Sequence, residues 1–323
     1  MLHINRKRGF TILELLLVLV IIAFFAAMVL PRLGGVFGDA HIKIRNNNIR
    51  EIAKEIRIWQ QERNGLPNKL INLVNRTDAD YVLPQIEDED EETGAETMPK
   101  SFYQSLKPYI HTLSAAEADE LQKMGVTYLM TLNDRIGSYG TSMPENSTPM
   151  KQEPVAVGLK VMMIGAGYDN AGTWTEGIAN GFSSYDADTG IAGVNGDGPG
   201  LGSTGMDHGH PEWMYRIVVG FGPDNSVVKD GTMEAAPICP ESMKRLQHIT
   251  QQYYVIVLPR LKATVTQVNN DNMPTLLTVV GEDEDRRDVT IGETQQEWEF
   301  AVVSPSGVNP AAKSAMWHIE NVQ

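Results

Sequence analysis

Residues 6–30 read RKRGFTILELLLVLVIIAFFAAMVL, a short basic cluster followed by a long apolar run. Within the apolar run, residues 10–30, only Thr11 and Glu14 are polar. A helix of about 20 residues is roughly 30 Å long, which matches the hydrocarbon core of a membrane. We therefore predict a membrane-spanning helix over residues 10–30.

The charges at the start of the chain predict its orientation. Arg6, Lys7 and Arg8 precede the apolar run closely. Basic residues beside a membrane span stay on the cytoplasmic side. We expect a single-pass protein with a cytoplasmic N-terminus and the remainder of the chain on the other side of the membrane.

A secretory signal peptide and a plain membrane anchor are alternative interpretations of this segment. A signal peptide has the same charged start and apolar middle, and Ala26 and Ala27 would serve as its small-residue cleavage site. The apolar run is long for a signal peptide, however, and it contains Glu14. A carboxylate inside a membrane costs roughly 2 to 3 kcal/mol, so we expect Glu14 to have a function that neither alternative provides.

The residues at the start of the apolar run resemble a known processing signal. Residues 7–15, KRGFTILEL, resemble the class III signal of type IV pilins and type II secretion pseudopilins. In that family a prepilin peptidase cleaves after the glycine, and the new N-terminal phenylalanine is N-methylated. The resemblance implies that residues 1–9 are a leader ending at Gly9, that Phe10 is the methylated mature N-terminus, and that the apolar helix is retained.

The resemblance also implies roles for Glu14 and Pro31. Glu14 is the fifth residue after the predicted cleavage site, where the family has its glutamate, and Pro31 lies where many pilins have a helix-kinking proline. Positions i and i+4 share a helix face, so the Phe10 amine and the Glu14 carboxylate can pair, within one chain or between chains. A pair between chains would set the axial register of a filament, because either group is costly when buried alone.

The sequence predicts one long helix over residues 10–63, weakened over 31–38 by Pro31 and the glycines after it. Apolar residues recur at helical spacing in its second half: Ile42, Ile49, Ile52, Ile56 and Trp59. This stripe is expected to pack on the protein's own sheet. Asn64-Gly65 is a C-cap signal for the end of the helix.

The remainder of the chain predicts strands, preceded by a helix with Ser114 as its N-cap. The predicted strands are 126–132, 155–164, 215–221, 253–258, 298–303 and 315–319. The turn Gly222-Pro223-Asp224-Asn225 is expected to close a hairpin. We predict an α+β fold in which the long helix packs on an antiparallel sheet, with a variable α/β region over 64–154 and a β-rich region over 155–323.

A long segment in the second half of the chain is rich in glycine and carboxylates. Residues 161–215 contain thirteen glycines, seven acidic residues and no Lys or Arg. Carboxylates among backbone carbonyls are the ligands that Ca²⁺ prefers, so Asp186, Asp188 and Asp197 are candidate calcium ligands in a loop over 165–212. The spacing matches no EF-hand, and a surface loop without metal is the alternative. Calcium is the only cofactor that we predict.

Two further motifs that suggest enzymatic or metal chemistry are incomplete. Residues 158–172 lead from a strand into two glycines, as in a dinucleotide-binding fold, but Asn170 stands where the third glycine belongs. A polar segment contains four potential metal ligands, Asp207, His208, His210 and Glu212, but no second cluster completes a site. The sequence has no nucleophile elbow and no phosphate loop. We therefore do not expect an enzyme.

The charge balance and the single cysteine narrow the class of protein further. Acidic residues outnumber basic residues by 41 to 27, which disfavours nucleic acid as a partner. Part of the excess is EDEDEE at residues 87–92, which we interpret as a solvated loop. Cys239 cannot form an internal disulfide, and we expect it to be buried as a small apolar residue; an intermolecular disulfide is the alternative.

Together these observations and the resemblance predict a structural filament subunit of a type IV pilus or a type II secretion pseudopilus. The implied partners are copies of itself, other pilin-like subunits, the prepilin peptidase and an assembly platform membrane protein. The implied location is the inner (cytoplasmic) membrane, with the C-terminal domain periplasmic or extracellular. A minor or tip adaptor subunit with a binding domain and a membrane-anchored extracytoplasmic enzyme are the alternatives.

Overall fold

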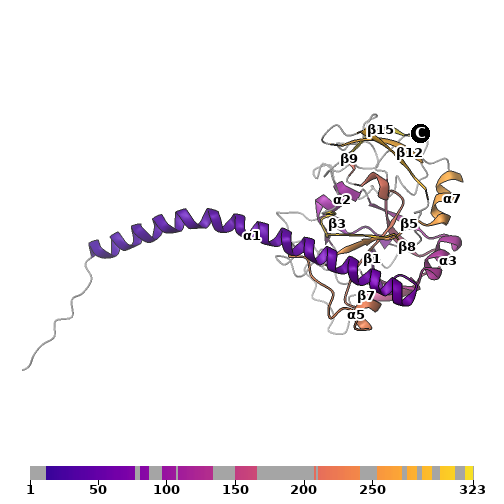
Figure 1. Cartoon of the computed structure of the whole chain (residues 1–323), viewed down its shortest axis with the longest axis horizontal. Coiled ribbons are helices and arrows are strands. Elements are labelled where there is room, and N and C mark those ends of the chain that lie inside the picture. Colours follow the sequence, from indigo (N-terminus) through magenta and orange to yellow (C-terminus); the bar gives the residue numbers. More distant parts are fainter. Residues whose placement is uncertain are drawn as a thin grey trace, which may run out of the picture. The chain divides into compact units, whose positions relative to one another are not determined.

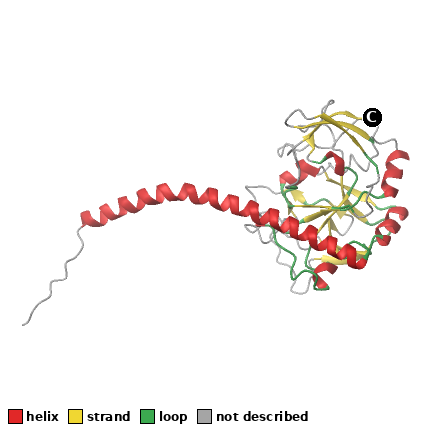
Figure 2. Ribbon diagram, in the orientation of Figure 1, coloured by secondary structure: helices red, strands yellow, loops and turns green. Residues whose placement is uncertain are grey.

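The chain combines a long N-terminal helix with a multi-stranded sheet and several short helices (Figures 1 and 2), so the predicted mixture of α and β structure is confirmed. The computed structural model describes residues 12–76, 81–86, 97–106, 108–133, 150–165, 207–208, 210–240, 253–270, 275–281, 286–292, 299–309 and 317–322. The chain divides into two compact units, Met1–Asn46 and Asn47–Gln323, which are described separately below.

Helix α1 extends from Ile12 to Arg63, as the sequence predicts from Ile12 onward. It is continuous through Pro31, so this proline does not end the helix, and a kink there remains a prediction. The helix ends because Asn64 adopts the left-handed conformation, with a φ of 51°. The Asn64 N–H still donates to the Gln60 carbonyl over 2.9 Å, which closes the last turn.

The part of α1 that belongs to the second unit has one buried apolar face. Its buried residues are Ile49, Ile52, Ile56 and Trp59. They share an apolar cluster with strand residues that include Val219, Ile256 and Val302. Ile42, the first residue of the predicted stripe, lies in the other unit and is exposed.

Nine strands form the largest sheet, in the order β14-β11-β10-β1-β6-β7, with β2 beside β1 and with β8 beside β10 and β5. Their bounds are β1 Leu70–Arg76, β2 Tyr81–Val82, β5 Pro108–Thr112, β6 Tyr128–Asn133, β7 Met150–Pro154, β8 Lys160–Ile164, β10 Ile217–Gly220, β11 Val255–Val257 and β14 Ala301–Val303. Strands from both predicted regions, 64–154 and 155–323, therefore belong to the same sheet.

Smaller elements complete the described chain. A four-stranded sheet has the order β13-β12-β15-β9, and β3 pairs with β4. The bounds are β3 Gln85–Ile86, β4 Thr97–Met98, β9 Asp207–His208, β12 Leu276–Gly281, β13 Arg286–Thr290 and β15 Trp317–Val322. The helices are α2 Lys100–Leu106, α3 Ala115–Lys123, α5 Ser226–Lys229, α7 Lys262–Asn270 and the 3-10 helix η3 Pro211–Trp213.

The prediction of an antiparallel sheet is only partly correct, because the large sheet is mixed. Strands β1 and β6 are parallel, with Leu70 opposite Leu129, and β3 and β4 are also parallel. A parallel pair needs a long crossover connection rather than a tight turn. The chain between β1 and β6 supplies one, because it passes through α2, β5 and α3. The other strand pairs described in the large sheet are antiparallel.

The large sheet has apolar residues on both faces, because alternate residues of a strand point to opposite sides. On one face, Val219, Ile256 and Val302 share a cluster with the buried residues of α1. On the other face lies a second cluster, which contains Val218, Val257, Val303 and, from α2, Phe102 and Leu106. Helices α1 and α2 therefore cover opposite faces of the sheet.

The predicted strands over 126–132, 215–221, 253–258, 298–303 and 315–319 correspond to β6, β10, β11, β14 and β15. The strand predicted over 155–164 is correct only from Lys160, because a turn precedes it.

The predicted hairpin at Gly222–Asn225 is wrong. Asn225 instead caps α5, since its side chain accepts hydrogen bonds from the N–H groups of Val227 and Val228. Cys239 is buried, as predicted.

Candidate assembly site

The first half of α1 exposes large apolar side chains on every side of the helix. These residues are Ile12, Leu13, Leu15, Leu16, Leu17, Val18, Leu19, Val20, Ile21, Ile22 and Phe24. Their exposed fractions run from 45% for Ile21 to 86% for Ile12. Because consecutive positions are exposed and a turn takes 3.6 residues, the apolar surface surrounds the helix. A helix that is apolar on all sides requires a covering environment.

The free energy available from covering this surface is large. Fully burying one such side chain contributes about 1.5 to 3 kcal/mol. Both a lipid bilayer and a bundle of similar helices supply apolar surroundings, and in either case the backbone N–H and C=O groups are already paired inside the helix. Either environment would cover the exposed apolar side chains between Ile12 and Phe24.

Glu14 lies in the first turn of α1, and the structure does not describe its side chain. Gly9, Phe10 and the basic cluster Arg6, Lys7 and Arg8 precede the described residues, so the Phe10–Glu14 pair remains a prediction. Pro31 lies within α1. Among the described residues, no helix combines the length and the apolar character that a membrane span requires.

The predicted calcium ligands Asp186, Asp188 and Asp197 lie outside the described residues. Within the ranges that the structure does describe, no group of three or more His, Cys, Asp and Glu side chains is arranged to hold a metal ion. A calcium site in the loop over 165–212 therefore remains a prediction.

The polar segment around His210 is held by contacts with its own chain. The His210 ring is buried and stacks on Trp213, with ring centroids 3.7 Å apart. Its Nδ1 lies 3.9 Å from Glu212 Oε1, and Glu212 Oε2 lies 3.2 Å from Arg287 Nη2. His208 pairs with Trp317 where β9 joins β15. These contacts give the segment a structural role that needs no metal.

Glu117 in α3 is a fully buried carboxylate that connects three elements. It completes a capping box with Ser114, the N-cap that the sequence predicts. Its Oε2 lies 2.9 Å from His111 Nε2 of β5, and its Oε1 accepts from Thr264 Oγ1 of α7. Burial raises the pKa of Glu117, but the hydrogen bond and charge of His111 and the hydrogen bonds of Thr264 and Ser114 outweigh burial and lower the pKa to about 2.

Arg216 and Arg260 are buried arginines that donate hydrogen bonds to backbone carbonyls. Arg216 donates to the carbonyls of Leu258 over 2.6 Å and Glu299 over 2.9 Å. Burial, followed by the charge of Arg260, lowers the pKa of Arg216 to about 10, so it stays charged near neutral pH. The bond to Glu299 fixes the chain directly before Phe300 and strand β14.

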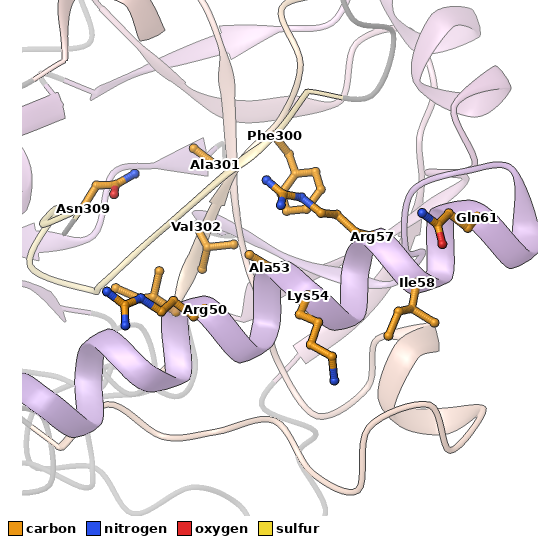
Figure 3. Close-up of a pocket in the computed structure, with 11 residues that line it drawn as sticks. Arg50, Ala53, Lys54, Arg57, Ile58, Gln61, Phe300, Ala301, Val302 and Asn309 are labelled. Atoms are coloured by element: carbon orange, nitrogen blue, oxygen red, sulfur yellow. The ribbon is translucent and has the colours of Figure 1, made fainter. Parts of the chain in front are cut away.

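A groove of about 590 Å³ lies between the second half of α1 and β14 (Figure 3). The helix residues that line it are Ile49, Arg50, Ala53, Lys54, Arg57, Ile58 and Gln61, and the facing residues are Phe300, Ala301, Val302 and Asn309. Three of these residues are cations and none is a carboxylate. We call this feature the basic groove. All of its residues belong to the second compact unit.

The charges of the basic groove are only partly compensated. Lys54 lies 3.1 Å from Glu55, its neighbour in sequence. Arg50 and Arg57 are exposed and form no ion pair within the described part of the chain. The groove therefore presents two uncompensated guanidinium groups on a chain whose formal net charge is −14.

The sequence contains only half of the signal for this groove. Arg50, Lys54 and Arg57 are spaced by four and three residues, so a helix places them along one side. The opposite wall, residues 300–302, is far away in the sequence and is placed there by the pairing of β14 with β11. Only the folded sheet brings the two walls together.

Comparison with known proteins supports the interpretation of the N-terminal segment. Residues 4–30 match the family model described as the prokaryotic N-terminal methylation motif. Neither a curated protein nor a solved structure matches the chain. The prepilin-type motif is thereby confirmed, and it is consistent with the family of type IV pilins and pseudopilins.

Proposed function

We propose that this protein is a structural subunit of a type IV pilus-like or type II secretion pseudopilus-like filament, made as a precursor and assembled through its N-terminal helix. One observation carries the proposal: the methylation motif at residues 4–30 coincides with a helix whose large apolar side chains are exposed on every side. The motif is typical of structural proteins, and we propose no enzymatic activity.

In this proposal the apolar half of α1 has two successive environments. Residues 10–30 first hold the subunit in the inner membrane, with the N-terminus cytoplasmic and the globular domain on the outer side. After the prepilin peptidase removes residues 1–9, an assembly platform membrane protein transfers the helix into a bundle of pilin-like subunits. Neither environment exposes the apolar side chains to water, so the transfer leaves them covered.

Glu14 supplies the specificity that apolar packing lacks. Apolar side chains alone do not fix how far one helix slides along another, whereas a single buried polar pair does. The methylated amine of Phe10 in one subunit and the Glu14 carboxylate of its neighbour would form that pair. We also propose that the second half of α1 stays packed on the sheet while the first half forms the filament core.

A minor or tip subunit of the same kind of filament is a second candidate. The observation that favours it is the four-stranded sheet β13-β12-β15-β9, which is present in addition to the nine-stranded sheet and gives the domain more surface for binding. Stoichiometry separates the two roles, because a major subunit dominates a purified filament and a minor subunit does not.

The test is to shear surface filaments from cells that produce the full chain and to measure intact mass and N-terminal sequence. We expect the mass of residues 10–323 with one added methyl group, and a sequence that begins at Phe10. A Gly9→Leu variant should keep its leader and accumulate in the membrane. A chain that begins at Met1, or after Ala27, would contradict the proposal.

A further inference from the structure

The basic groove has the composition of a site for an acidic peptide. Arg50 and Arg57 present guanidinium groups, which bind carboxylates through two parallel hydrogen bonds. The facing wall is β14, which ends the strand order of the large sheet in the described chain. An edge strand offers unpaired backbone groups to an extended segment. The groove therefore combines cations for charge recognition on one side with an edge strand on the other.

This chain contains a segment that fits such a groove. Residues 87–92 are six consecutive acids, EDEDEE. Arg50, Lys54 and Arg57 rise along the helix in steps of about 6 Å and about 4.5 Å. Alternate residues of an extended strand are about 6.7 Å apart, so one side of the segment can present successive carboxylates to the three cations.

The layers of the fold favour a second copy as the source of this segment. Leu83 and Met98 lie on either side of the acidic residues in sequence, and both belong to the apolar cluster that also contains α2 residues. That cluster lies on the face of the sheet opposite to α1. The described residues that flank the acidic segment therefore lie on the face away from the basic groove of the same chain. We propose that the basic groove of one copy binds residues 87–92 of a second copy, a contact that rests on the proposed filament.

The test uses two variants of the full chain and a zero-length carbodiimide cross-linker, which joins a lysine amine to a carboxylate. Copy A keeps Lys54 but has the six acids of 87–92 replaced by their amides. Copy B keeps the acids but carries Lys54→Arg, which preserves the groove charge without a reactive amine. A cross-link between Lys54 and 87–92 in filaments containing both copies can form only between chains. We expect mass spectrometry to find this cross-link.

The outcomes separate this proposal from the proposed function. If the wild-type chain forms no filaments, the filament function is overturned and the contact falls with it. If filaments form and Lys54 is not joined to 87–92, only the contact is overturned. A cross-link in the wild-type chain that is absent from the mixture of A and B places the segment on its own groove, which also overturns the proposal.

Charge reversal supplies an independent measurement. Arg50→Glu combined with Arg57→Glu should reduce filament yield by about tenfold, because it places like charges in contact. Adding Glu87→Lys, Glu89→Lys and Glu91→Lys to the same chain should restore the yield. The matched control, Lys151→Glu with Lys262→Glu, changes net charge equally at exposed positions outside the groove and should leave the yield unchanged. Equal loss in the control, or no restoration in the combined variant, would overturn the proposed contact.

Discussion

The hydroxyl of Thr264 in α7 donates a hydrogen bond of 2.5 Å to Oε1 of Glu117 in α3, two residues that are 147 positions apart in the chain. Glu117 also contacts His111, so one buried carboxylate joins two helices to strand β5. The stability that it contributes should depend on pH, because only the ionised carboxylate accepts all of these hydrogen bonds.

The first prediction concerns acid stability. The folded-state pKa of Glu117 is lowered from 4.5 to about 2, so its contribution is present above about pH 4.5 and is lost as the pH falls towards 2. One pKa unit corresponds to about 1.4 kcal/mol, so this lowering of the pKa contributes on the order of 3 kcal/mol. Glu117→Gln should therefore lose most of this stability near neutral pH and much less near pH 2, as measured by thermal unfolding of the full chain in detergent.

Asp119→Asn is the matched control for this experiment. Asp119 lies on the same helix, but it is exposed and pairs with Lys123. It should change the melting temperature little at any pH. Equal pH profiles for wild type and Glu117→Gln would show that the Glu117 cluster does not contribute in this way.

The second prediction concerns Glu14. Glu14→Leu makes the helix more apolar, so membrane insertion should be unchanged or improved. If Glu14 pairs with the Phe10 amine of a neighbour, the variant leaves that amine buried and unpaired, which costs about 3 to 5 kcal/mol at each contact. Filaments should be lost or severely reduced while the subunit accumulates in the membrane, as measured by immunoblots of sheared and membrane fractions.

Thr11→Leu serves as the control for Glu14→Leu, since it removes the other polar side chain of the apolar run without removing a charge. We expect it to assemble. Normal filament yield from Glu14→Leu, in cells without a wild-type copy, would show that the carboxylate does not set the register.

The elements that could be predicted from the sequence are those with local signals. The end of α1 follows from Asn64, and the start of α3 follows from Ser114 and Glu117, three residues apart. Strand β1 was not predicted, because LINLVNR lacks the alternation of a half-buried strand: Asn72 is buried and bonds to Thr131 and to the Lys160 carbonyl. Its Nδ2 group finds these two acceptors only in residues distant in sequence, and its buried Oδ1 has no hydrogen-bond partner among the described residues.

Two local patterns in the sequence identify the right residues, but the structure that these residues form differs from what local spacing indicates. The residues Gly222–Asn225 do form a turn, but Asn225 starts a helix instead of closing a hairpin. The spacing of Arg50, Lys54 and Arg57 places these cations along one side of α1, yet the groove itself depends on β14. The pairing of β14 with β11 joins residues distant in sequence, so local spacing could not predict the groove.

The third prediction concerns Asn68, which follows the end of α1. Its Oδ1 accepts hydrogen bonds from the N–H groups of Lys69, Thr127 and Tyr128, over 2.9, 3.1 and 2.8 Å. Asn68→Ala leaves these donors without their acceptor, which should lower the free energy of unfolding by about 2 kcal/mol or more. Thermal unfolding of the full chain measures this loss.

Asn68→Asp is the informative companion variant. It keeps the accepting oxygen and loses the amide donor that bonds to Thr127 Oγ1 over 2.6 Å. It should therefore be more stable than Asn68→Ala. Asn270→Ala, at an exposed position at the end of α7, should be close to wild type. Equal stability of all three variants would contradict the role of Asn68.

The fourth prediction concerns Cys239, whose exposed fraction is 1%. A maleimide reagent should not modify the thiol in the folded protein and should modify it fully after denaturation, because burial denies access. Intact mass before and after reaction gives the answer. Rapid labelling of the folded chain, or a disulfide-linked dimer on a non-reducing gel, would favour the intermolecular disulfide instead.

The parallel pairing of β1 with β6 has a consequence for the order in which the chain folds. Strand β1 needs β6 on one side, with Ile71 opposite Met130, and β10 on the other, with Ile71 opposite Gly220. During synthesis from the N-terminus, β1 emerges early and its end pairs with β2 at Asn75 and Arg76, yet Ile71 and Asn72 lack their β10 partners until residue 220 is available. Contacts of such long sequence separation form slowly, since the entropy of loop closure must be overcome first. The nascent domain therefore exposes an open strand edge for most of its synthesis, the stage at which a chaperone would protect it from aggregation.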